Sequence, residues 1–412
     1  MSELQTLSEV QAEILSRIEP LPSVTIPLAD AAGRTLAADI DARDDIPPFD
    51  NTAMDGFALR SDDTTHAASQ SVELVVDGQV EAGADTLPNV GAGHAVRIYT
   101  GAPMPPGADA VVPWEKTEKF DDQSVTLDAP VRAGACIRRR GEDVTRGTVL
   151  LTPGTQLGPG AIGLLATVGR STVEVGRRPR VAVHSSGNEL VPVDAELTPG
   201  KIRNSNLYSI AARLTEWGAD VLPRPVLLDT PEDVRAGLTA TLELQPDAIV
   251  TTGGVSAGDL DFIKVVAAEL GDEVAVRKVN MKPGKPLVDG TIGGVPFFGL
   301  PGNPAACLVS FEMFVRPVLA RLEGRTDGAP PRRRGRLAHD ATFPRIPRVQ
   351  FLRAIAEYDE TEESYRVTVP QAQGSHQMSS FAHANALLEW GIANEQTPEH
   401  IPAGTSVTVH LL

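Results

Sequence analysis

The sequence predicts a multidomain protein, in which a doubly wound, mostly parallel α/β domain is flanked by β-rich regions and followed by a small C-terminal β-barrel-like domain. Three observations predict this fold class. The chain has 412 residues, more than a single hydrophobic core usually accommodates. Short apolar runs separated by Gly, Pro and Asp fill residues 24–176 and return after residue 329. Between these stretches, strand and helix patterns alternate, as in parallel α/β sheets.

Charge and composition argue against several functional classes. The 54 acidic side chains outnumber the 37 basic ones and give a net charge of -17, which repels a nucleic acid backbone. Two cysteines are too few for a disulfide framework and favour a reducing compartment. The first residues lack the basic region of a signal peptide, and no apolar run approaches the roughly 18 residues that span a membrane. We therefore expect a cytoplasmic protein without nucleic acid or membrane partners.

An amphipathic helix is predicted at the start of the chain. Ser8 and Gln11 form a capping-box pattern, and Val10, Ile14 and Ile18 repeat at helical spacing. A run rich in Pro, Gly and Arg at 324–336 is typical of a linker. The expected units are residues 1–45 with 145–178, a β-rich second region at 46–144, the α/β domain at 179–328 and the C-terminal β-domain at 329–412.

The α/β domain is predicted to begin with a buried strand at 180–186, followed by an amphipathic helix with Leu207 and Leu214 on its apolar face. Thr230, Pro231 and Asp233 are an N-cap, an N1 proline and a capping-box acid, so they mark the start of a second helix. The remaining elements expected here are strands at 219–228, 247–252 and 274–279, a helix at 262–270, a hairpin at 291–302 and a long helix at 304–322.

Ligands of open α/β sheets bind at the carboxyl ends of the strands, and three loops occupy that position. They carry Ser186 in HSSGNEL, residues 251–261 in TTGGVSAGDLD, and Pro301 with Asn303 in GLPGNPAA. Each loop leads to a helix N-terminus, where unpaired N–H groups favour an anion. The sequence therefore predicts a ligand site at this edge, although Asn303 followed by Pro304 is also an ordinary helix start.

The loop after the third strand is suited to phosphate. Gly253 and Gly254 permit close backbone approach, and Ser256 supplies a hydroxyl, although a simple tight turn also explains glycines. The carboxylates of Asp259 and Asp261 follow directly and suggest a magnesium position. Glu189 and Asp229 lie near strand ends and could complete such a site, but each is also a common helix-start carboxylate.

Lys282 and Lys285 are three residues apart in MKPGKP, where prolines and a glycine shape the backbone. Two ammonium groups held close together repel each other unless an anion lies between them. The pair therefore predicts an anion site, with an ordinary solvated lysine pair as the alternative. No GxxxxGK[ST] loop and no dinucleotide fingerprint is present, which argues against ATP hydrolysis and dinucleotide redox chemistry.

A GxSxG pattern at residues 254–258 raises a competing hypothesis, a serine hydrolase with Ser256 as nucleophile. Such an enzyme needs a later Asp and then a His in the same domain. The first histidine after Ser256 is His339, beyond the predicted linker, so we favour the phosphate interpretation.

Six motifs, taken together and in order, resemble the molybdopterin molybdenumtransferase family, which includes the E-domain of gephyrin. The similarity covers nearly the whole chain and also includes QGSHQMSS at 373–380. The motifs are NTAMDGFA at 51–58, RIYTGAPMPPGADAVVP at 97–113, RRRGEDV at 138–144, TTGGVSAGDLDF at 251–262, MKPGKPL at 281–287 and GLPGNPAACLVSFEMFVRP at 299–317.

The resemblance implies a reaction and an assembly. Adenylylated molybdopterin and molybdate are the implied substrates, and hydrolysis of the adenylyl bond with Mg²⁺ releases AMP and molybdenum cofactor. The α/β domain is then of the molybdopterin-binding type. An elongated homodimer is implied, in which the second region of one subunit reaches the α/β domain of the other. The adenylyltransferase that makes the substrate and molybdoenzyme chaperones are expected as further partners.

The resemblance also implies roles for individual residues. Asp55, Thr100 and Asp143 are expected to contribute to the shared site from the second region. Glu189, Asp229 and Asp261 are the expected magnesium set, and Asp261 is also expected to be catalytic, together with Asp55 and the lysine pair. The molybdate site is expected to contain Lys282, Lys285, Arg353 and Ser375. The remaining substrate-binding residues are Ser186, Gly253, Gly254, Ser256, Pro301 and Asn303.

Two positions depart from the usual family pattern. Asn188 stands in SGNEL where an acid is usual, and Asn204 stands in NSN where the family commonly has DSN. These changes bear on the metal role of the first loop and leave the glycine loop and the lysines intact. Two further alternatives stay open: the related adenylyltransferase, which lacks the flanking β-rich regions, and a gephyrin-like scaffold.

Overall fold

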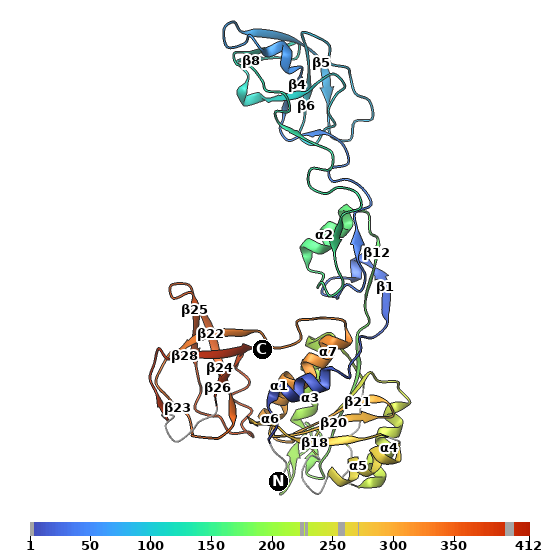
Figure 1. Ribbon diagram of the computed structural model, residues 1–412, viewed down its shortest axis with the longest axis vertical. Coiled ribbons are helices and arrows are strands. Elements are labelled where there is room, and N and C mark those ends of the chain that lie inside the picture. The colour runs from blue at the N-terminus through green and yellow to red at the C-terminus, as the bar shows by residue number, and fades with distance from the viewer. Residues whose placement is uncertain (1–3, 223–225, 227–229, 254–259, 271, 392–398) are drawn as a thin grey trace.

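The computed structural model describes residues 4–222, 226, 230–253, 260–270, 272–391 and 399–412. The molecule is elongated (Figure 1). A β-sheet region lies at one end, a small region with α2 lies in the middle, and the α/β domain and the C-terminal domain lie side by side at the other end. Among the described residues, none of the helices has the length and apolar character that crossing a membrane would require. The predicted fold class is confirmed.

The distal region, which we define as residues 46–144, is built on a six-stranded sheet in the order β7-β4-β6-β5-β9-β8. Phe57, Leu74 and Val125 are buried in its core. Its short helices are the 3-10 turns Ser61–Thr64 and Trp114–Lys116. The strands are β4 (Gly56–Leu59), β5 (Val72–Val80), β6 (His94–Ile98), β7 (Ala110–Pro113), β8 (Lys119–Phe120) and β9 (Ser124–Leu127), with β3 (Asn51–Thr52) paired to β10 (Ile137–Arg138) beside the sheet.

Two chain segments connect the distal region to the rest of the molecule. Asp50 pairs with Arg139 and Asp45 pairs with Arg140, each with a nitrogen to oxygen distance of 2.6 Å. Beyond this connection, β1 (Ser23–Pro27) pairs with β12 (Thr172–Gly176), and β2 (Ile40–Asp41) pairs with β11 (Val149–Leu151). Helix α2 (Pro159–Thr167) and a 3-10 turn at Leu28–Asp30 complete the middle region. The β-rich interpretation omitted α2, because its apolar run is too short and uniform for periodicity to distinguish helix from strand.

Helix α1 (Leu7–Leu15) begins two residues earlier than the predicted capping box. Thr6 is the N-cap: its hydroxyl accepts from the Glu9 N–H, and the Glu9 carboxylate accepts from the Thr6 N–H. The predicted box of Ser8 and Gln11 was therefore wrong. The Gln11 side chain instead points to another element, where its Nε2 donates to the carbonyl oxygen of Met313 at 2.6 Å.

The long helix predicted at 304–322 is present but contains a wider turn. It comprises α6 (Pro304–Ser310), a π-helical turn (Phe311–Val315) and α7 (Arg316–Leu322). Pro317 explains the wider turn, because its ring clashes with the carbonyl four residues earlier and it has no N–H to donate. That carbonyl belongs to Met313, and Gln11 supplies the missing donor.

The α/β domain contains a six-stranded sheet in the order β16-β13-β17-β21-β20-β18. Five of these strands point the same way, since β20 alone runs antiparallel to both of its neighbours. Helices α1, α3 and α6–α7 cover one face of the sheet, and α4 and α5 cover the other, as expected for a doubly wound domain. The bounds are β13 (Arg180–Ser185), α3 (Ser205–Glu216), β16 (Asp220–Leu222), α4 (Pro231–Leu242), β17 (Ala248–Thr252), α5 (Leu260–Glu269), β18 (Val274–Lys278), β20 (Pro286–Ile292) and β21 (Val295–Leu300).

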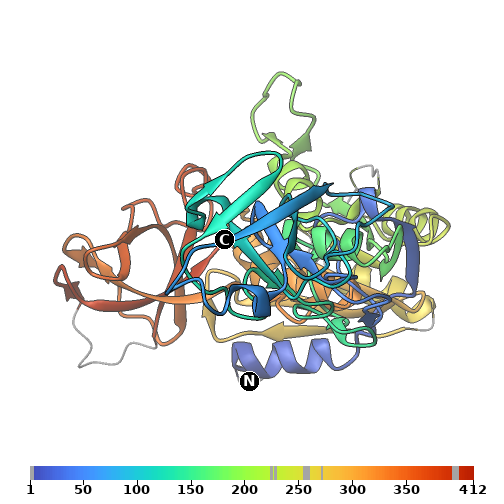
Figure 2. The same cartoon turned by 90° about the horizontal axis from the view of Figure 1, so that it is seen from above.

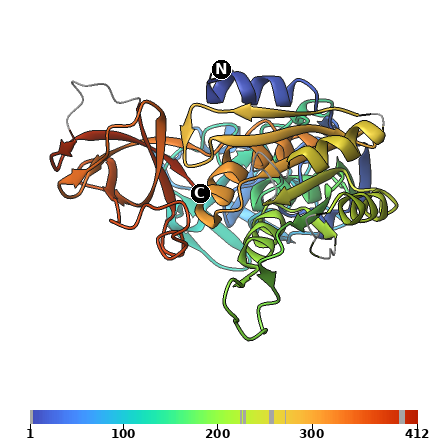
Figure 3. The same cartoon turned by 90° about the horizontal axis from the view of Figure 1, so that it is seen from below.

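A small two-stranded excursion leaves the first loop of the domain. Strands β14 (Leu190–Val191) and β15 (Ile202–Arg203) are parallel, and the segment between them projects from the domain in Figures 2 and 3. After it, Asn204 caps helix α3, because its Oδ1 accepts from the Leu207 N–H at 3.3 Å and from the Ser185 hydroxyl at 2.9 Å. The amide at this position is therefore an effective helix cap.

The C-terminal domain is a closed five-stranded barrel, because β24-β25-β22-β28-β26 pair in sequence and β26 pairs back to β24. The Arg-rich part of the predicted linker belongs to this barrel as β22, which corrects that expectation. β19 (Met281–Lys282) of the α/β domain adds to the barrel alongside β24. The barrel strands are β22 (Arg332–Leu337), β24 (Val349–Asp359), β25 (Ser364–Thr368), β26 (Ala386–Trp390) and β28 (Ser406–Leu411), and a separate pair is β23 (Ala341–Thr342) with β27 (His400–Ile401).

Candidate functional site

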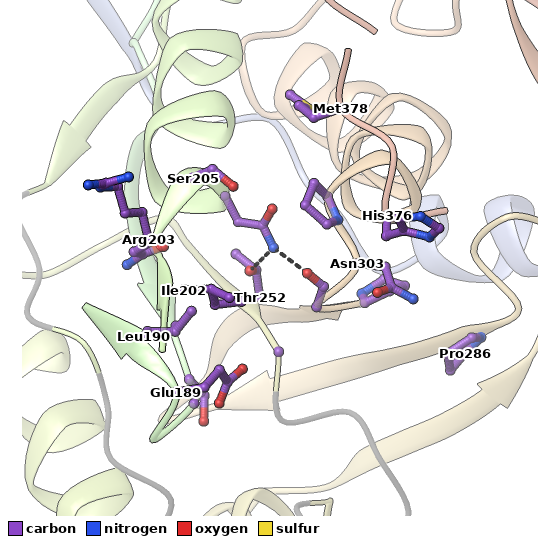
Figure 4. A pocket seen from close by; sticks show the side chains of 18 residues that line it. Glu189, Leu190, Ile202, Arg203, Ser205, Thr252, Pro286, Asn303, His376 and Met378 are labelled. Carbon is purple, nitrogen blue, oxygen red and sulfur yellow. Dashed lines mark hydrogen bonds between the residues drawn. The ribbon is translucent and has the colours of Figure 1, made fainter. Parts of the chain in front are cut away.

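A cavity of about 730 Å³, the first cavity, lies at the carboxyl ends of β13, β17 and β21 (Figure 4). Ser186, Gly253, Pro301 and Asn303, four of the residues predicted from the three loops, line it, and so does Glu189. The parallel strands explain this convergence, since their loops leave the sheet at the same edge.

Hydrogen bonds hold the three loops together at the floor of the first cavity. The Ser186 N–H donates to the Thr252 carbonyl at 2.9 Å. The Nδ2 of Asn206 donates to the Thr252 hydroxyl and to the Gly302 carbonyl, both at 2.8 Å. Since a carbonyl oxygen only accepts, the amide orientation of Asn206 is fixed. These bonds keep the ligand-facing backbone of the three loops in one arrangement.

Gly253 is required by the close approach of two loops. Its φ is +84°, and a Cβ at this position would lie 2.3 Å from the Ser186 carbonyl oxygen. Any side chain would therefore separate the first loop from the glycine loop. Gly254 and Ser256, the other predicted phosphate-loop residues, lie outside the described residues.

The predicted magnesium set is described only in part. Glu189 lines the first cavity, and its carboxylate is the type of oxygen donor that Mg²⁺ prefers. Asp229 lies outside the described residues, as does the side chain of Asp261. Within the part of the chain that is described, no group of three His, Cys, Asp or Glu side chains is placed to hold a metal ion. The donor chemistry of Glu189 fits the implied ion.

A second cavity of about 980 Å³ lies between the α/β domain and the barrel. Lys282, Lys285, Arg353 and Ser375, the four residues expected at an oxyanion site, all line it. Backbone pairing explains why they are close together. Lys282 pairs with Gln350 in the parallel ladder of β19 and β24, and Arg353 follows three residues later on β24.

Arg353 is a fully buried cation without a carboxylate partner among the described residues. Its Nε donates to the Ser380 hydroxyl, and its Nη2 donates to the carbonyls of Ala372 and Gly374, each at 3.0 to 3.1 Å. Nη1 is buried and has no acceptor in the described part of the chain. Burial lowers the pKa of Arg353 to about 10, so the side chain is still charged at neutral pH. The Nη1 group of Arg353 can therefore donate a hydrogen bond to one further acceptor.

Ser375 connects the barrel to the start of helix α6. The Ala305 N–H donates to the Ser375 carbonyl at 3.0 Å, and the Nδ2 of Asn303 donates to the Ser375 hydroxyl at 3.2 Å. Asn303 is the helix N-cap, as predicted, but its side chain makes no capping bond to the helix itself. The loop of the α/β domain and the segment around Ser375 therefore form one continuous wall shared by the two cavities.

The three residues predicted from the distal region are not part of these cavities. Asp55 is half-buried and Thr100 and Asp143 are exposed, and all three line neither cavity of their own chain. Asp55 accepts from the Thr100 N–H and hydroxyl, both at 2.7 Å, and these bonds lower the pKa of Asp55. In Figure 1 the distal region lies at the opposite end of the molecule from the α/β domain and the barrel, whose residues line both cavities.

Three of the polar residues that line the first cavity and were not predicted as site residues are Arg203, Asn206 and His376. Arg203 lies on β15, directly before helix α3, and Asn206 lies on the first turn of that helix. His376 lies in QGSHQMSS, where only Ser375 was singled out. The polar NSN sequence at a helix N-terminus was the signal available for Asn206.

The fold and its site define a multidomain protein whose candidate ligand site lies at the carboxyl edge of a doubly wound α/β domain. Three family models match the chain in order: MoeA N-terminal region (domain I and II) over residues 5–169, probable molybdopterin binding domain over 182–321, and MoeA C-terminal region (domain IV) over 334–412. A molybdopterin molybdenumtransferase of Haemophilus influenzae is 35% identical, and the match covers 99% of both chains. The chain belongs to the molybdopterin molybdenumtransferase family.

Other relatives agree with this assignment. Molybdopterin molybdenumtransferase 2 of Mycobacterium tuberculosis is 39% identical over 94% of this chain and 95% of its own. The crystal structure of a molybdopterin biosynthesis protein from Pyrococcus horikoshii superimposes with a TM-score of 0.81 at 32% identity, over 99% of both chains. The expectation of an enzyme of molybdenum cofactor biosynthesis is confirmed.

Proposed function

We propose that this enzyme inserts molybdenum from molybdate into adenylylated molybdopterin and releases AMP. The observation that carries the proposal is the second cavity, which Arg353, Lys282 and Lys285 line together and in which the buried Nη1 of Arg353 has no acceptor among the described residues. A tetrahedral dianion satisfies all three cations, whereas a neutral ligand leaves a buried charge uncompensated. The hydroxyl of Ser375 lines the same space and can hold a further oxygen.

The first cavity is suited to the phosphate groups of the pterin substrate. Residues at the starts of α3 and α6 line it, and the N-terminal ends of these helices favour an anion. Glu189 would hold Mg²⁺ together with Asp229 and Asp261, and a bound Mg²⁺ supplies charge neutralisation at the adenylyl phosphate. Ser256 is assigned to substrate binding, as are Ser186 and Asn303. The substrate then extends across the shared wall toward the second cavity.

We further infer a homodimer in which each site uses two chains. Thr100 holds the half-buried carboxylate of Asp55 in place at the far end of an elongated molecule, and Asp143 is exposed in the same region. Such a carboxylate has no ligand to act on within its own chain but can reach a site in a second copy. A cytoplasmic enzyme that receives its substrate from an adenylyltransferase and delivers cofactor to molybdoenzyme chaperones fits this proposal.

Purified protein supplied with adenylylated molybdopterin, Mg²⁺ and molybdate tests the proposal. We expect release of AMP and formation of cofactor that activates a molybdoenzyme lacking it. The double variant Lys282→Ala with Lys285→Ala is expected to lose the ability to use molybdate, while it still binds AMP. Lys278→Ala is the matched control, because Lys278 is an exposed lysine of the same domain that lines neither cavity. Absence of both products from folded wild-type protein would overturn the proposed function.

A further inference from the structure

The two cavities meet at a wall of four residues, Pro286, Pro301, Asn303 and His376, which line both of them. If the pterin nucleotide occupies the first cavity and molybdate the second, the dithiolene sulfurs reach molybdenum at this wall. The inference below therefore rests on the proposed function. It concerns the proton transfers that must accompany the new molybdenum–sulfur bonds.

Of the four shared residues, only His376 has a side chain of the type that serves as a general acid and base. The two prolines have no titratable group, and the Nδ2 of Asn303 already donates to the Ser375 hydroxyl. The two ring nitrogens of a histidine allow it to accept a proton from one group and donate a proton to another. Figure 4 shows His376 beside Asn303 at the rim of the first cavity. Its side chain is exposed, so a ligand can contact it.

The position of His376 is fixed by the backbone around it. The Gly374 N–H donates to the Gln377 side chain at 2.6 Å, and the Gln377 N–H donates to the Gly374 carbonyl at 3.0 Å. On the other side, the Ser375 carbonyl accepts from helix α6. The imidazole folds over Gly374, since a Cβ there would lie 2.9 Å from the ring carbon Cε1 of His376. A larger residue at position 374 would displace the ring.

We propose that His376 is a catalytic residue that transfers protons from the dithiolene thiols to a leaving oxygen of molybdate. Two molybdenum–sulfur bonds form and one molybdenum–oxygen bond breaks. Both thiol protons end on the departing oxygen, which leaves as water, and the product is a trioxo molybdenum dithiolene dianion. No electron is transferred, and the histidine returns to its starting protonation state.

The surrounding charges suit this step. Lys282, Lys285 and Arg353 hold the dianion from the second cavity, and Arg348 lines the same space. Asp340 also lines the second cavity, and Glu189 and Arg203 line the first. These cations cannot replace His376 as carriers, because Arg and Lys side chains are poor proton acceptors at neutral pH.

The test compares His376→Ala and His376→Gln with His383→Gln. His383 is an exposed histidine of the same barrel segment that lines neither cavity, which makes it the matched control. Single-turnover formation of cofactor is followed with saturating substrates, and binding of AMP with Mg²⁺ and of molybdate alone is measured by calorimetry. Both His376 variants are expected to slow formation by about 100-fold or more. Each binding constant is expected to stay within about twofold, and added imidazole is expected to restore part of the rate of His376→Ala.

The outcomes separate the inference from the proposed function. An unchanged rate in both His376 variants overturns the proton-transfer role while the proposed function stands. A loss of molybdate or AMP binding that equals the loss of rate also overturns it, because His376 would then only shape the wall. If wild-type protein forms no cofactor, the proposed function fails, and the inference fails with it.

Discussion

Asp55 and Thr100 are joined by two hydrogen bonds of 2.7 Å, one from the backbone N–H and one from the hydroxyl of Thr100 to the same carboxylate oxygen. Asp55→Asn keeps an acceptor oxygen at this position and removes the charge. We therefore expect cofactor formation to fall by at least about tenfold while the thermal unfolding temperature hardly changes. The rate assay and calorimetry check this, and Asp62→Asn, an exposed acid of the same region, is the control.

A mixture of two inactive variants tests whether the site is shared between chains. Protein carrying Asp55→Asn is mixed and reassembled with protein carrying the two lysine substitutions. In a shared site, each mixed dimer contains one intact combination, so the mixture should regain about one quarter of wild-type activity. If Asp55 and the lysines act within one chain, no activity returns, and the homodimeric site would have to be abandoned.

Asn206 is expected to control nucleotide affinity without contacting the reaction centre. Asn206→Ala removes the bonds to Thr252 and Gly302 that hold the loops of the first cavity. Loss of these bonds should weaken AMP binding by about 1 to 3 kcal/mol. Calorimetric titration measures the change. Tyr208→Phe, an exposed position on the same helix, should leave the affinity unaltered, and an unaltered affinity in Asn206→Ala would refute the expected role.

Gln11 is expected to contribute to stability through the helix that contains Pro317. Gln11→Met keeps the volume of the side chain but removes the donor to the Met313 carbonyl. The unpaired carbonyl should lower the free energy of unfolding by about 1 to 3 kcal/mol. Denaturant unfolding measures this, with Ser8→Ala on the exposed side of the same helix as control. Equal stability of the two variants would contradict the prediction.

The barrel should lose stability in acid through Glu389. Hydrogen bonds, first from His410 and also from Arg332, hold the pKa of Glu389 below its ordinary value. A lowered folded pKa means that the ionised carboxylate stabilises the fold above the unfolded pKa. This stabilisation disappears as the pH falls below about 4.5 toward the folded pKa.

Glu389→Gln should therefore be less stable than wild type at neutral pH, and the difference should shrink as the pH is lowered. Urea unfolding at several pH values measures the difference. Glu357→Gln, an exposed position on β24, serves as the control. If the difference in unfolding free energy stays constant from about pH 7 to pH 3, the charge of Glu389 does not contribute to the stability of the barrel.

Sequence patterns predicted the secondary structure and the residues of the first cavity better than they predicted the residues of the second cavity. Ser186, Gly253 and Asn303 could be placed together because carboxyl ends of parallel strands share one edge of a sheet. Arg353 could not be placed beside Lys282 by any periodicity, since the pairing of β19 with β24 joins distant segments of two domains. It entered the prediction only through family resemblance.

Contacts between distant segments account for the other differences. Gln11 and Met313 are 302 residues apart in the chain, so a local capping pattern was the only interpretation available for Gln11. The same applies to Asp55 and Thr100, whose hydrogen bonds fix a carboxylate that sequence alone could not orient. The four-unit division of the chain and the individual roles of the site residues stay predictions.

The short ladder between β19 and β24 connects the α/β domain to the barrel through the main chain. Because Lys282 is paired to the barrel strand that carries Arg353, the two cations belong to one backbone ladder although they come from different domains. The spacing between these two positive charges is therefore set by strand pairing and not by the fit of one domain surface against the other.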